Sequence, residues 1–87
     1  MITETLTYKL RQIFPKANTR IERYMSGKII IQEAIGKFFF GLFTDYKLIA
    51  YRDKNNWWHT DNKDLANKIA EVLEANVELH GWLNYPD

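Results

Sequence analysis

The chain has 87 residues, 46% of them hydrophobic and 15% aromatic, and its formal net charge is +1. This length predicts a single domain over residues 1–87, and this composition excludes a disordered chain. Because there is no cysteine, disulfides, thiolate metal ligands and a cysteine nucleophile are excluded as well.

The first predicted element is an amphipathic helix that stops at Pro15. Apolar residues recur before it at the spacing of one helical face, and proline cannot continue a helix. This apolar stripe consists of Ile2, Leu6, Leu10, Ile13 and Phe14.

A block of strands follows, in which β-branched and aromatic residues dominate. Alternating apolar residues, with turn pairs at Ser26-Gly27 and Gly36-Lys37, predict an antiparallel meander. The predicted strands cover residues 19–25, 28–35, 38–43 and 47–52, with a short fifth strand at 56–60.

The second predicted helix has the clearest periodicity, and we expect Thr60 or Asp61 to cap its start. Its end is open, because both Asn76 and Gly81 suit the left-handed residue that terminates a helix. If the helix ends at Asn76, the segment VELHGWL alternates like a strand or an extended tail. The apolar stripe of this helix is Leu65, Ile69, Val72 and Leu73.

Together these elements predict an α+β fold: a four- or five-stranded antiparallel meander sheet flanked by an N-terminal and a C-terminal helix, α-β-β-β-β-(β)-α. The strand at 38–43 places Phe38, Phe40 and Leu42 on one face, and Phe39, Gly41 and Phe43 on the other. The sheet is therefore apolar on both sides. If both helices cover one face, the other keeps an aromatic patch. The alternatives are that the helices divide between the faces, or that the C-terminal GWLNY covers the second face.

No pattern of catalytic or ligand-binding residues stands out. His59 is followed by Thr60 and Asp61, but residues adjacent in sequence seldom aim at one point, and no nucleophile motif accompanies them. His59 and His80 lack the spacing of a zinc site, and the isolated glycines form no phosphate-binding loop. We therefore expect no enzymatic activity, no metal, no cofactor and no small-molecule substrate.

Nucleic-acid binding is the alternative function. Residues 1–54 carry ten Lys and Arg against five acidic residues, a balance of +5, whereas residues 55–87 carry two against six, a balance of −4. The helix-strands-helix order resembles a double-stranded-RNA-binding domain in outline. That family has a lysine cluster at the start of its second helix, where this chain has TDNKDLANK, and it has one strand fewer. The basic residues of the strand block, interleaved with aromatic ones as in single-strand binders, are Arg20, Arg23, Lys28, Lys37, Lys47, Arg52 and Lys54.

Protein binding is the preferred prediction. Adjacent residues of a strand face opposite sides, so one of Trp57 and Trp58 should anchor the core and the other should join the aromatic patch. Exposed apolar patches usually mark an interface, with a partner protein or with a second copy in a homodimer. The expected contact residues are Phe39, Phe43, Ile49, Tyr51, Trp57 and Trp58.

The expected cellular location follows from the N-terminal segment and from the length of the apolar runs. The N-terminal MITETLTYKL lacks the pattern of a signal peptide, and the apolar runs III and FFFGLF fall far short of the roughly 20 residues that span a bilayer. We expect a cytoplasmic protein that does not bind membranes. By analogy, a small adaptor or inhibitor encoded by a phage or mobile element suits this size and the lack of catalytic motifs.

Overall fold

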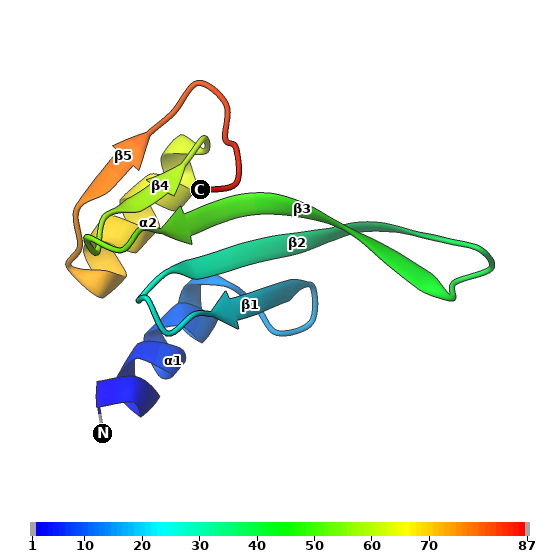
Figure 1. The fold of residues 1–87 in the computed structure, drawn as a ribbon, viewed down its shortest axis with the longest axis horizontal. Helices are drawn as coiled ribbons and strands as arrows, with labels where there is room; N and C mark the ends of the chain where they lie inside the picture. The colour runs from blue at the N-terminus through cyan, green and yellow to red at the C-terminus, as the bar shows by residue number, and fades with distance from the viewer. Residues whose placement is uncertain (1, 87) are drawn as a thin grey trace.

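The computed structural model describes residues 2–86, with side chains from Thr5 onward, as two helices and one five-stranded sheet (Figure 1). The elements in chain order are α1 (Ile2–Ile13), β1 (Thr19–Arg23), β2 (Ile29–Phe38), β3 (Phe43–Arg52), β4 (Trp58–Thr60), α2 (Lys63–Leu73) and β5 (Val77–Leu79). Neither helix is long and apolar enough to cross a membrane.

The strands lie in the order β1-β2-β3-β4-β5, so spatial order follows chain order. The first four strands form an antiparallel meander, as predicted. The last strand pairs parallel to β4, because α2 carries the chain back along the sheet. The α+β class is confirmed, and the segment VELHGWL does begin with a short strand.

The predicted strand at 38–43 is wrong. These residues form the turn of a long β2–β3 hairpin, in which the amide of Leu42 donates to the carbonyl of Phe39 over 3.1 Å. The chain reverses here because Phe39, Phe40 and Gly41 all have positive φ, at 54°, 56° and 83°. The expected turn at Gly36-Lys37 is instead an irregularity inside β2, between Ala34 and Gly36, which the strand passes without reversing.

The ends of α2 also differ from the expectation. The N-cap is Asn62, whose side chain accepts a hydrogen bond from the amide of Leu65 at 3.0 Å, and neither Thr60 nor Asp61 has this role. The C-cap is Glu74, with φ of 51°, so the helix ends before both Asn76 and Gly81. Left-handed caps favour glycine, but the chain here places a glutamate in that conformation.

Both helices cover the same face of the sheet, where α1 and α2 contact each other. From Leu6 onward, their apolar stripes meet the inward side chains of β2, β3 and β4 in a single cluster. The side chain of Ile2, also predicted in the first stripe, lies outside the described residues. The buried residues of this core are Leu10, Ile13, Phe14, Ile29, Ile31, Ala50, Trp58 and Ile69.

The C-terminal tail, residues 80–86, returns along the opposite face from the end of β5 (Figure 1). Gln32 is buried on that face, and its side-chain amide donates to the hydroxyl of Tyr85 over 2.7 Å. Tyr85 and Pro86 also line a hollow with Ile30, which is only 5% exposed. The second face is therefore partly closed by the tail, as one of the sequence alternatives anticipated.

Candidate functional site

The most prominent surface feature is the distal part of the β2–β3 hairpin, residues 35–47, which we call the hairpin arm. It projects well beyond the other elements (Figure 1). Pairing of β1 with β2 stops at Glu33, and β4 pairs with β3 only from Ala50 to Arg52. Within residues 2–86, the two strands of the arm thus pair only with each other.

The end of the arm exposes a group of apolar side chains. The rings of Phe38, Phe39 and Phe43 contact one another, with centroids 5.2 to 5.7 Å apart. All three are about half exposed or more, and Phe40 and Leu42 project still further into solvent. We call this group the tip cluster: Phe38, Phe39, Phe40, Leu42 and Phe43.

The backbone of the tip cluster is unfavourable for its side chains. Turn residues with positive φ are normally glycine, asparagine or aspartate, because a Cβ crowds the neighbouring carbonyl in that conformation. Here two successive phenylalanines, Phe39 and Phe40, occupy it. Neither folding preference nor solubility favours exposed phenylalanine at these positions.

The predicted aromatic patch does not form one surface. Phe39 and Phe43 belong to the tip cluster, whereas Ile49 packs against the helix-side core. Tyr51 stacks on the ring of His59 on the opposite face. Trp57 is 44% exposed in the turn before β4, and Trp58 is buried against Phe14.

Phe38, Phe40 and Leu42 are the members of the tip cluster whose exposure the sequence did not predict, because the pattern placed them on a buried strand face. The signal that locates the turn is Gly41, in the middle of the aromatic run, since an isolated glycine in a strand pattern often marks a break in the strand.

The basic residues of the nucleic-acid prediction do not gather on one surface. Arg20 lies over the ring of Tyr46 and donates to Gln32 on the tail side of the sheet, whereas Arg23 donates to Thr7 of α1 on the helix side. Arg52 donates to the carbonyl of Gly27, and partial burial, followed by repulsion from Arg23, lowers its pKa. Lys37 is in the arm, Lys47 borders a hollow beside Ile49, and Lys28 and Lys54 border the cleft described below.

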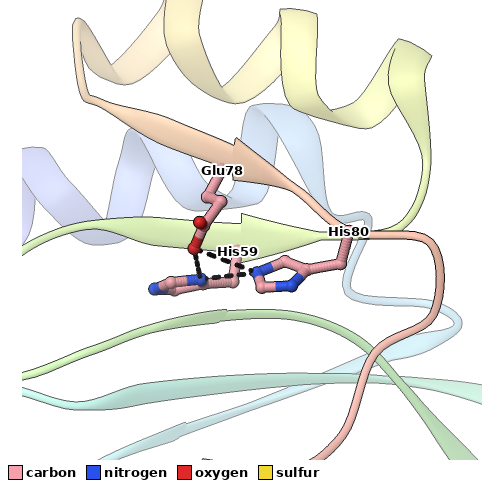
Figure 2. Close-up of side chains that lie close together, drawn as sticks. All are labelled: His59, Glu78 and His80. Atoms are coloured by element: carbon pink, nitrogen blue, oxygen red, sulfur yellow. Dashed lines mark hydrogen bonds and ion pairs between the residues drawn. The ribbon is translucent and has the colours of Figure 1, made fainter.

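A second feature joins the two histidines. His59 lies on β4, directly opposite Glu78 of β5 in the parallel register, and His80 follows β5 (Figure 2). The Nδ1 atom of His59 is 2.8 Å from Nε2 of His80 and 3.2 Å from Oε2 of Glu78. The same Oε2 is 3.4 Å from Nε2 of His80. We call these three residues the histidine cluster.

Two further contacts fix the position of the His59 ring, one at its Nε2 atom and one on the face of the ring. Its Nε2 atom is 2.8 Å from Oδ2 of Asp53, and the ring stacks on Tyr51 with centroids 4.5 Å apart. Partial burial opposes ionisation of Asp53, but hydrogen bonds from His59 and from the amides of Trp57 and Asn55 outweigh it and lower its pKa. Asp53 is therefore held as a carboxylate facing the imidazole.

The histidine cluster borders a cleft of about 510 Å³ between the sheet and the C-terminal tail. Tyr51, Asp53, His59 and His80 line the cleft with tail residues, among them Trp82. Sequence reasoning considered His59 with its neighbours Thr60 and Asp61 and missed this arrangement. Glu78 and His80 reach His59 only through the pairing of β5 with β4, which nothing in the local sequence around His59 indicates.

Function has to be inferred from the hairpin arm and the histidine cluster themselves. Comparison with known proteins gave no match to a protein-family model, to a curated protein or to a solved structure.

Proposed function

We propose that this protein is a small non-enzymatic binding protein, an adaptor or an inhibitor, that docks onto another protein through its hairpin arm. The observation that carries the proposal is the tip cluster: five large apolar side chains exposed together at the end of a projecting hairpin. With about 150 to 250 Å² per aromatic ring, the four phenylalanines alone present roughly 400 to 700 Å² of apolar surface.

That area supports a partner interface. The largest apolar patch on a typical monomer measures about 300 to 600 Å², and such patches are often functional. A standard interface buries about 800 Å² on each partner, so the tip cluster supplies more than half of one side. Obligate homodimers generally bury more, at least about 2,000 Å² in total, which favours a different protein over a second copy of this chain.

The strand edges of the arm favour a protein partner over a lipid surface. Residues 35–47 carry outward backbone groups that no other described strand pairs. Such groups are costly in hydrocarbon, where nothing satisfies them. A protein partner satisfies them by adding a strand to the free edge, while its apolar pockets receive the phenylalanine rings.

The test begins with a photo-crosslinking amino acid placed at position 40 in cells of the source organism. A matched probe replaces Tyr8, which is similarly exposed but lies on α1, away from the arm. We expect a discrete crosslinked protein at position 40 only. The identified partner is then purified and titrated with the wild-type chain and with Phe40→Ser by calorimetry.

Because Phe40 is fully exposed, Phe40→Ser should leave folding intact and weaken the affinity at least about tenfold, as expected for an aromatic hot spot. An unchanged affinity contradicts the proposal. So does crosslinking only to a second copy of the chain, or flotation of the wild-type chain with lipid vesicles that Phe40→Ser abolishes.

A further inference from the structure

We infer that the histidine cluster is a binding site for a divalent transition metal ion, with Zn²⁺ as the best match. The proposed ligand atoms are Nδ1 of His59, Oε2 of Glu78 and Nε2 of His80, which converge from β4, β5 and the segment after β5 (Figure 2).

The distances among these atoms suit a single ion. In a tetrahedral zinc site, with bonds of about 2.0 to 2.1 Å, neighbouring ligand atoms lie about 3.3 to 3.4 Å apart. The two contacts of Glu78, at 3.2 and 3.4 Å, match this separation. The contact between the histidine nitrogens, at 2.8 Å, needs to widen by only about 0.5 Å.

The position of the ion follows from the same three distances. The circle through the three atoms has a radius of about 1.8 Å, which is shorter than a Zn–N bond. An ion about 2.05 Å from all three atoms therefore lies roughly 0.9 Å out of their plane. In a tetrahedral site the metal is displaced in this way from the plane of three ligand atoms toward the fourth ligand.

Asp53 gives His59 the form that a metal ligand requires. Its Oδ2 atom lies 2.8 Å from Nε2 of His59, so in the neutral imidazole the proton sits on Nε2 and the Nδ1 lone pair is available to a metal beside Glu78 and His80. This is the carboxylate–histidine arrangement found behind many zinc ligands, where the carboxylate orients the ring and increases its basicity.

Without a metal, the same three atoms share protons, so a metal ion binds here in competition with protons. In the neutral tautomer with the proton on Nε2, the Nδ1 atom of His59 and Oε2 of Glu78 are both acceptors, 3.2 Å apart. A divalent cation serves the three atoms at once.

The ligand types also narrow the class of metal. Two imidazoles with one carboxylate suit Zn²⁺ and other borderline ions, whereas Mg²⁺ and Ca²⁺ prefer oxygen donors. Three protein ligands leave a coordination position for water or for a bound molecule in the neighbouring cleft.

The experiment uses the untagged full chain, treated with chelator, dialysed, and titrated with ZnCl₂ by calorimetry. We expect one ion per chain with a Kd of about 10 μM or tighter, corresponding to roughly 7 kcal/mol. Co²⁺ provides a second readout, because its visible absorption reports both the number and the type of ligands.

The variants are Glu78→Gln and His80→Ala, which change partly exposed side chains and spare the buried His59. Each should weaken Zn²⁺ binding at least about tenfold and alter the Co²⁺ spectrum. Glu71→Gln, which alters an exposed acid on α2, is the control and should bind as the wild-type chain does. Binding weaker than about 1 mM, or equal binding by all four proteins, would overturn the inference.

Discussion

At the scale of single residues, Trp57 and Trp58 are adjacent in the chain but differ sharply in burial. Trp58 is 2% exposed and stacks on Phe14 with ring centroids 6.4 Å apart, whereas Trp57 is 44% exposed. The alternation of side chains predicted that only one of them enters the core. Which one does so depends on the pairing of Trp58 with Arg52 across β3 and β4.

This difference in burial predicts different costs of truncation. Trp58→Ala should lower the free energy of unfolding by about 3 to 5 kcal/mol, because it leaves a cavity between α1 and the sheet. Trp57→Ala should lower it by less than about 1 kcal/mol. Urea unfolding followed by circular dichroism measures both. Equal losses would show that the two rings do not differ in burial in solution.

The histidine cluster brings together single residues that are far apart in the sequence. His59 and Asp53 lie six residues apart and meet across the turn before β4. Glu78 and His80 follow α2 in the chain, whereas His59 and Asp53 precede it. Their distance from His59 in the sequence concealed the cluster, because metal and catalytic patterns are recognised by spacing that is local or characteristic.

At the scale of the elements, strand propensity gave a wrong prediction for the end of the hairpin arm. Aromatic residues favour strands, so the run FFFGLF predicts one. The structure makes its centre a turn in which two phenylalanines take positive φ. Local propensity is a weak constraint at an exposed tip, where no core fixes the register. The strand β2 runs past the irregularity between Ala34 and Gly36 and ends at Phe38.

The strain at the tip predicts that stability and binding respond in opposite directions. Phe40→Gly should raise the free energy of unfolding by about 0.5 to 1 kcal/mol, because glycine accepts positive φ without steric cost, and should weaken partner binding. Phe40→Ala removes the same ring but keeps a Cβ, so it should weaken binding with no gain in stability. Thermal unfolding of the two variants compares them; a Phe40→Gly variant no more stable than Phe40→Ala would show that the turn is unstrained.

At the scale of the whole molecule, the sheet is covered on both sides, by two helices on one face and by the C-terminal tail on part of the other. The tail is held by the hydrogen bond from Gln32 to Tyr85 and by the contact of its last described residues with the hollow beside Ile30. Gln32 also accepts from Arg20, which links β1, β2 and the tail through one side chain.

This link predicts that two substitutions of Tyr85 lower the free energy of unfolding by different amounts. Tyr85→Phe removes the acceptor of the Gln32 amide and should lower the free energy of unfolding by about 0.5 to 1.5 kcal/mol. Tyr85→Ala also uncovers the hollow and should cost about 1 kcal/mol more. Tyr8→Phe, on an exposed helix position, is the control and should change nothing measurable. If both Tyr85 variants unfold at the wild-type urea concentration, the tail is not docked on the sheet in solution.

The sequence by itself determined the α+β class, both helical stripes, the antiparallel meander and the burial of one tryptophan of the pair. These features follow from periodicity, which is a local property of the chain and survives in any tertiary arrangement. The turn of the hairpin arm and the caps of α2 are local features that strand and capping preferences assigned wrongly. The covering of the second face was decided by tertiary structure. So was the histidine cluster, because the parallel pairing of β5 with β4 alone brings Glu78 and His80 to His59. Contacts of that kind depend on strand order and register across a helix, and no local pattern specifies them.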